Sequence, residues 1–208
     1  VKNEKWDNSS PYFDGETILC LIKAAKYLGY TQYKPLIKES VLAMAKTYTT
    51  DQWHIDPQSR LTKGFFQWSL MAYWEYQDAG WENSDLFRDY ILSLSWWSIH
   101  INKIDEKKRN TSYAFEGLIF GYLVAKNNGN NAAASEILYI IDKVLYKLTT
   151  WQVGGPLEHE NKFLIRTKPH KKSGIGGILN AKDFDNVRID VVQHQMHAVL
   201  LALRYIYN

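Results

Sequence analysis

The chain has 208 residues and a formal net charge of +3, with 46% hydrophobic and 23% charged residues. This balance excludes a disordered or fibrous chain and predicts one folded domain, residues 1–208. The low net charge, with basic residues spread along the sequence, argues against nucleic-acid binding. No apolar run is long enough to span a bilayer. Because the sequence begins with Val, we expect a piece of a longer protein, and the cellular compartment stays open.

The cysteine and aromatic content narrows the kinds of site to expect. The single Cys20 excludes an internal disulfide and a multi-cysteine metal site, and no cofactor is predicted. Aromatic residues reach 14% and include eight Trp. Such an excess either lines a sugar-binding groove or a protein interface, or fills wide gaps between helices. Both interpretations stay open at this point.

Helical periodicity dominates the sequence from its first apolar segment. Apolar residues recur at spacings of three and four within residues 14–28, and Gly29 is placed to end that helix. A second helix is predicted over residues 33–47, with Pro35 in its first turn, where proline is tolerated. The short connection between the two helices predicts an antiparallel hairpin.

The same hairpin pattern recurs twice along the chain. Residues 63–78 pair with 85–101, and residues 113–127 pair with 132–151. A final amphipathic helix over residues 189–207 has no partner. Seven helices are therefore predicted, and no run alternates as a strand would.

A polar residue recurs in the first turn of alternate helices, at Glu16, Gln67, Glu116 and Gln193. The intervals are 51, 49 and 77 residues, and the last becomes similar to the others once a loop insertion within residues 153–187 is set aside. Repetition near 50 residues predicts an all-α, incomplete α/α toroid of about seven helices. In such a toroid the inner helices share one direction, so we expect these four starts to converge on one cleft lined by polar and aromatic residues.

Three short segments carry a resemblance to known proteins. They are SPYFDGE at residues 10–16, GGI at 176–178 and RIDVVQH at 188–194. With the helix pattern around them, the chain from residue 10 to 207 resembles a loosely defined, mostly uncharacterised group of bacterial α/α-toroid proteins. That group is similar in architecture to six-hairpin glycosidases, polysaccharide lyases and the C-terminal domain of glucuronyl C5-epimerases. The resemblance implies an open toroid, with further hairpins supplied by another domain or chain.

Carboxylates at the helix starts are the first candidates for chemistry. Asp14 and Glu16 either orient a substrate and transfer protons, or serve as the helix N-cap and as a charge at the positive end of the helix dipole. Glu116 is a stronger candidate for a catalytic role, because caps stand upstream of it and it occupies the predicted inward face.

The start of the last helix holds the densest polar cluster. Arg188 is suited to binding a carboxylate or uronate, and His194 to proton transfer, with Asp190 as a further catalytic candidate and Gln193 as a substrate-binding one. The structural alternative is that Arg188 and Asp190 form a salt bridge that fixes the preceding loop. His194 and His197 lie three residues apart, but without a third ligand at a recognisable spacing no metal site is predicted.

These residues predict a carbohydrate-active domain that binds or processes a polysaccharide or oligosaccharide by acid–base chemistry of the lyase, epimerase or hydrolase type. Glu116 and His194 are the predicted proton-transfer residues, Trp68 and Tyr113 the stacking platforms, and Asp14 and Gln67 further substrate contacts. The alternative is a non-catalytic helical-repeat module that binds a peptide or protein. That alternative predicts a large exposed apolar patch.

Overall fold

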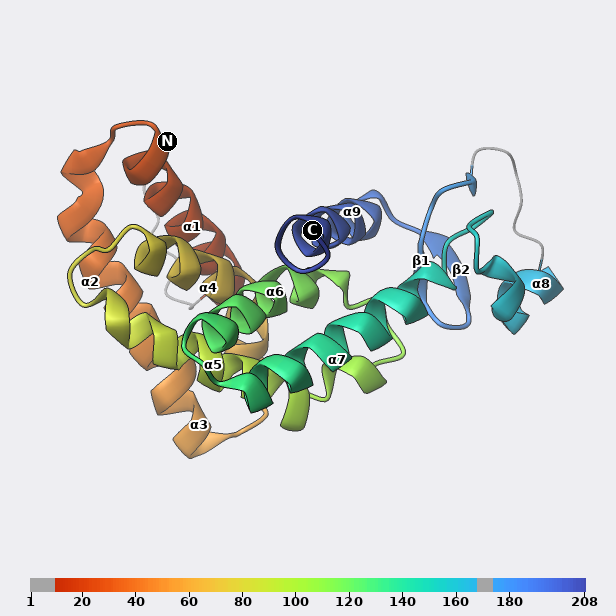
Figure 1. Ribbon diagram of the computed structural model, residues 1–208, viewed down its shortest axis with the longest axis horizontal. Coiled ribbons are helices and arrows are strands. Elements are labelled where there is room, and N and C mark those ends of the chain that lie inside the picture. Colours follow the sequence, from red (N-terminus) through yellow and green to blue (C-terminus); the bar gives the residue numbers. More distant parts are fainter. Residues whose placement is uncertain (1–9, 168–173) are drawn as a thin grey trace, which may run out of the picture. The chain divides into compact units, whose positions relative to one another are not determined.

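A computed structural model describes residues 10–167 and 174–208, and it is predominantly helical, which confirms the predicted all-α class (Figure 1). In this part of the chain seven helices have twelve or more residues, as predicted. They are α1 (Pro11–Tyr27), α2 (Lys34–Ala45), α4 (Arg60–Asp78), α5 (Ser84–His100), α6 (Ser112–Asn127), α7 (Asn131–Thr149) and α9 (Ile189–Tyr205). No described helix has the length and apolar character needed to cross a membrane.

Shorter elements connect these helices. They are η1 (Thr31–Tyr33), the π-helical turn η2 (Lys46–Thr50), α3 (Asp51–Ile55), η3 (Ile104–Glu106), η4 (Glu158–Glu160) and α8 (Lys162–Thr167). The predicted hairpin stops are present: Gly29 and Gly129 have φ of 79° and 69°, in the left-handed region that ends a helix.

One helix start differs from its prediction. Helix α1 begins at Pro11 rather than at Asp14, and Ser10 occupies the N-cap position. Proline fits the first helical position because it lacks the N–H that would be unpaired there. Asp14 therefore lies inside the first turn, and the N-cap interpretation of Asp14 was wrong.

The loop insertion contains strands that the sequence pattern did not reveal. Strands β1 (Leu179–Ala181) and β2 (Phe184–Val187) pair antiparallel, with Leu179 opposite Val187. The prediction of no strand was wrong because runs of three and four residues are too short for an alternating pattern to register. Backbone hydrogen bonds hold β1 in place: the N–H of Leu179 donates to the carbonyl of Trp151, and the N–H of Asn110 donates to that of Asn180.

The chain divides into two compact units, with the boundary inside α5: unit 1 ends at Ile91 and unit 2 begins at Leu92. In unit 1, α1 packs against α4 and α2. In unit 2, α6 packs against α7 and α9. The prediction of a single toroid domain stays a prediction.

Helix α6 is the centre of unit 2. Between Ser112 and Ala125 all of its residues are buried except Tyr113 and Leu123, which are partly exposed. A helix with so few exposed residues belongs to a core rather than to a surface. Any polar side chain on α6 therefore needs a partner from a neighbouring helix.

In unit 1, Gly15 sets the approach of α1 to α4. A Cβ built on Gly15 would lie 2.7 Å from Cβ of Trp68 and 3.4 Å from Cδ2 of Phe65. Because Trp68 Cβ is fixed to the backbone, it cannot rotate out of the way.

We predict that Gly15→Ala lowers the free energy of unfolding by about 1–3 kcal/mol, because overpacking outweighs the better helix propensity of alanine. Urea unfolding of the full chain measures the change. Thr17→Ala, at an exposed position of α1, is the control and should leave stability unchanged or slightly raised. Equal stability of the two variants would show that α1 can move away from α4 at no cost.

Candidate functional site

The start of α6 is fixed by a single side chain just before it. Asn110 Oδ1 accepts a hydrogen bond from the N–H of Ser112 at 2.9 Å, and Asn110 Nδ2 donates to the carbonyl of Leu179 at 3.2 Å. This arrangement ties the first turn of α6 to strand β1. It positions Glu116, one turn into the helix, where only 2% of the residue is exposed.

Two histidines of α9 approach the Glu116 carboxylate. His194 Nδ1 lies 3.0 Å from both carboxylate oxygens, and His197 Nδ1 lies 2.9 Å from Oε1. Residues three apart lie on one face of a helix, so both rings reach the same group. An ionised carboxylate only accepts hydrogen bonds, so each Nδ1 donates to it. We refer to Glu116, His194 and His197 as the carboxylate–histidine cluster.

The cluster favours a protonated histidine. The hydrogen bond to Glu116 raises the pKa of His194 above its usual value; burial acts in the opposite direction, and the charges of Glu116 and Asp190 add to the rise. The side chain of His194 is 17% exposed and that of His197 is 46% exposed. The cluster therefore joins a buried negative charge to a histidine that reaches solvent.

Tyr113 borders the cluster. Its ring centroid lies 6.5 Å from that of His194, with the two rings at 73°. Burial raises the pKa of Tyr113, against a smaller lowering effect of Arg109. Tyr113 therefore keeps its proton well above neutral pH.

Arg188 and Asp190 bind each other at the start of α9. Arg188 Nη2 lies 2.6 Å from Asp190 Oδ2, and Nε lies 3.1 Å from Oδ1. Burial pushes the pKa of Asp190 upward, but the hydrogen bonds from Arg188 and from the N–H of Val191 outweigh it, so the pKa is lowered. The two residues thus form the salt bridge that was the alternative to a binding role. The carboxylate-binding role of Arg188 stays a prediction. Gln193 is exposed.

The remaining candidates lie in unit 1. Asp14 accepts a hydrogen bond from the hydroxyl of Tyr48. Gln67 is 5% exposed, and its Nε2 finds no hydrogen-bond partner among the described residues. Trp68 packs edge-on against Tyr12 with ring centroids 5.5 Å apart, and Glu16 is exposed. The substrate and catalytic roles of these residues, and the cleft shared by all four helix starts, stay predictions.

In the described part of the chain no group of three or more His, Cys, Asp or Glu is placed to hold a metal ion. The Nδ1 atoms of both histidines face Glu116 instead. Sequence spacing placed His197 beside His194 but did not reveal that Glu116 joins them.

The chain matches no known protein family, no curated protein and no solved structure. The resemblance to toroid proteins therefore stays a prediction.

The raised pKa of His194 predicts a pH-dependent stability. Below about pH 6.5, histidine is protonated in both the folded and the unfolded chain, so the pairing with Glu116 contributes in full. As the pH rises through the raised folded pKa, this contribution is lost. We predict that Glu116→Gln costs about 1.5–3 kcal/mol at pH 6, as expected for loss of a charged hydrogen bond, and clearly less at pH 9.

Urea unfolding at the two pH values measures this difference. Glu136→Gln is the matched control, since Glu136 lies 3.2 Å from His100 Nε2 in an exposed pair. Exposed pairs contribute only about 0–1 kcal/mol, so this variant should change stability little. A Glu116→Gln effect of the same size at pH 6 and pH 9 would contradict the pairing.

Proposed function

We propose that unit 2 carries an acid–base catalytic site, with the carboxylate–histidine cluster as its proton-transfer centre. The observation that supports this proposal is the buried Glu116 carboxylate within 3.0 Å of Nδ1 of both His194 and His197. A carboxylate that holds Nδ1 fixes the ring and its tautomer and stabilises the imidazolium form. The second nitrogen, Nε2, is then the atom that exchanges a proton with a substrate.

The two histidines have different parts in this proposal. His194 is the more buried and has the raised pKa, so it stores a proton near neutral pH. His197 is about half exposed, so it is the ring that solvent or a substrate reaches. Both rings contact Glu116, which keeps them oriented through a turnover.

The proposed substrate class is a polysaccharide or oligosaccharide. Three features support it: the high aromatic content, the resemblance to toroid proteins whose architecture is similar to that of glycan-processing enzymes, and the position of the Tyr113 ring near His194. Glycoside hydrolysis usually needs two carboxylates that flank the scissile bond. In the cluster one carboxylate is bound by two histidines, and the nearby Asp190 is bound by Arg188. This composition favours proton abstraction, as in a lyase or an epimerase, over hydrolysis.

Turnover of a panel of uronate-containing and neutral glycans tests the proposal. We predict that Glu116→Gln and His194→Ala each lower kcat/KM by about a hundredfold or more, the scale of general acid–base catalysis, with folding checked by circular dichroism. Glu136→Gln should keep wild-type turnover. If Glu116→Gln and His194→Ala both turn over every active glycan at the wild-type rate, the proposed centre is wrong.

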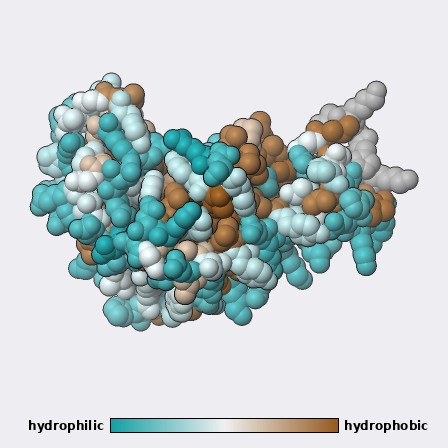
Figure 2. Space-filling model, in the orientation of Figure 1, coloured by the Kyte–Doolittle hydropathy of each residue, from teal (hydrophilic) through white to brown (hydrophobic). Residues whose placement is uncertain are grey.

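A second candidate function rests on the apolar surface of α9. Ile189, Met196, Leu200 and Leu203 are 88%, 60%, 55% and 48% exposed, at spacings that place them along one side of the helix. Hydrophobic side chains are visible in Figure 2 in the region that α9 occupies in Figure 1. Such a surface suits a helical-repeat module that binds a peptide or protein through an apolar face.

Light scattering separates this candidate from the enzyme. If α9 is a binding face, we predict that the purified chain self-associates and that replacing Leu200 and Leu203 together by Gln restores a monomer. These leucines are exposed, so the double change should not disturb the core. A monomeric wild-type chain would count against the module.

A further inference from the structure

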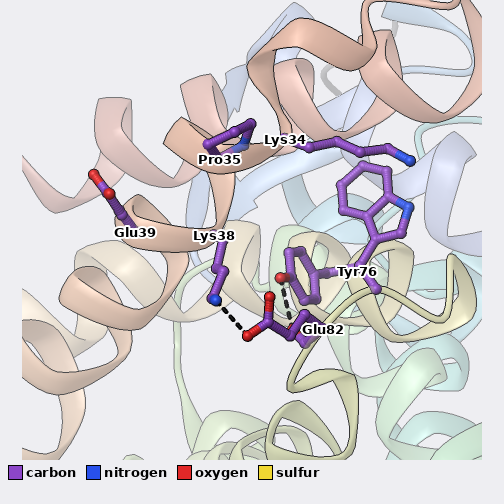
Figure 3. A pocket seen from close by; sticks show the side chains of 7 residues that line it. Lys34, Pro35, Lys38, Glu39, Tyr76 and Glu82 are labelled. Atoms are coloured by element: carbon purple, nitrogen blue, oxygen red, sulfur yellow. Dashed lines mark hydrogen bonds and ion pairs between the residues drawn. The ribbon is translucent and has the colours of Figure 1, made fainter.

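Unit 1 contains an open cavity of about 470 Å³ that the acid–base site does not include. It lies between the start of α2 and the turn that links α4 to α5 (Figure 3). Ligand pockets for small molecules range from about 300 to 1,000 Å³, so the cavity is large enough for one sugar or one aromatic ring with a substituent.

The apolar wall of this cavity is held in a fixed geometry. The rings of Tyr76 and Trp81 meet edge to face, with centroids 5.3 Å apart and an interplanar angle of 85°. Tyr76 is buried, and its hydroxyl donates to the backbone carbonyl of Glu82 at 2.9 Å, which ties the turn to α4. Pro35 of α2 also lines the cavity. A rigid aromatic wall suits a ligand that has a flat apolar face.

The charged residues of the cavity are not equivalent. Lys38 is neutralised by an ion pair with Glu82. Lys34 pairs with no carboxylate in residues 10–167 and 174–208; its Nζ lies 5.0 Å from the centroid of the Trp81 ring instead. The Glu39 side chain points away from Lys38 and Glu82 in Figure 3. The Lys34 ammonium is therefore the charge that a ligand on the aromatic wall would meet.

We propose that this cavity binds a small carboxylate with one flat apolar face, with the face against Trp81 and the carboxylate on Lys34. Two ligand sources share this chemistry: a uronate sugar, which presents C–H groups on one face, and an aromatic carboxylate. The site lies in unit 1, and its test does not depend on the proposed catalytic centre in unit 2. In this cavity the ammonium of Lys34 is available to a ligand carboxylate. The guanidinium of Arg188, by contrast, is already bound by Asp190.

Binding of sodium glucuronate, glucose, sodium benzoate and benzyl alcohol to the full chain tests the proposal. The assigned indole N–H signal of Trp81 in a ¹H–¹⁵N spectrum reports occupancy. We expect a saturable shift with glucuronate, with benzoate or with both, which identifies the source, and weaker binding of the matched neutral ligand. Lys34→Gln should weaken carboxylate binding about fivefold, the scale of one exposed charge pair.

Two further variants test whether the effect of Lys34 comes from its charge at this cavity. Glu39→Gln removes a negative charge from the rim and should strengthen carboxylate binding. Lys126→Gln is the matched control, because Lys126 also lies over an aromatic ring, with Nζ 5.5 Å from the centroid of Tyr122, and lines no part of this cavity. Carboxylates that leave the Trp81 signal unmoved would overturn the proposal. So would wild-type affinity in Lys34→Gln.

Discussion

Unit 2 depends on a carboxylate that is buried on α6, a helix most of whose residues are themselves buried. An ionised carboxylate without partners is too costly to place in such a core, so donors must come from the helix packed against it. Helix α9 supplies them through His194 and His197, both within 3.0 Å of Glu116. The position at which α9 packs against α6 therefore depends on the hydrogen bonds between Glu116 and the histidines, and so on the protonation of the histidines. One interaction serves both the packing of the unit and its proposed chemistry.

The surrounding structure keeps this interaction in place. Asn110 fixes the start of α6 to β1. A shift of Glu116 along the helix axis would break the hydrogen bonds that Asn110 makes with Ser112 and with Leu179. Arg188 and Asp190 bind each other at the first turn of α9, and Asp190 adds negative charge that favours the protonated form of His194. The short strands of the insertion therefore have a role at the site, because β1 receives the hydrogen bonds from Asn110.

The long helices were predictable from the sequence. The short strands, and the contacts between residues far apart in the sequence, were not. The seven long helices follow from apolar spacing and from glycines such as Gly29 and Gly129, since both signals are local. Glu116 and His194 were selected because each stands at the start of a repeated helix, yet their contact joins residues 78 positions apart. Strands β1 and β2 were not predicted because they are only three and four residues long, and β1 also depends on backbone bonds to distant residues such as Trp151. The cavity at Lys34 and Trp81 was missed for a similar reason: nothing in the local pattern brings α2 to the α4–α5 turn.

The ¹⁵N chemical shifts of the imidazole nitrogens test most directly whether Glu116 accepts a hydrogen bond from Nδ1 of both histidines. At a pH where the rings are neutral, we expect His194 and His197 both to carry their proton on Nδ1 in the wild-type chain, and we expect this preference to be lost in Glu116→Gln. A proton on Nε2 of both rings in the wild-type chain would rule out these hydrogen bonds, because the buried carboxylate would then lack its donors.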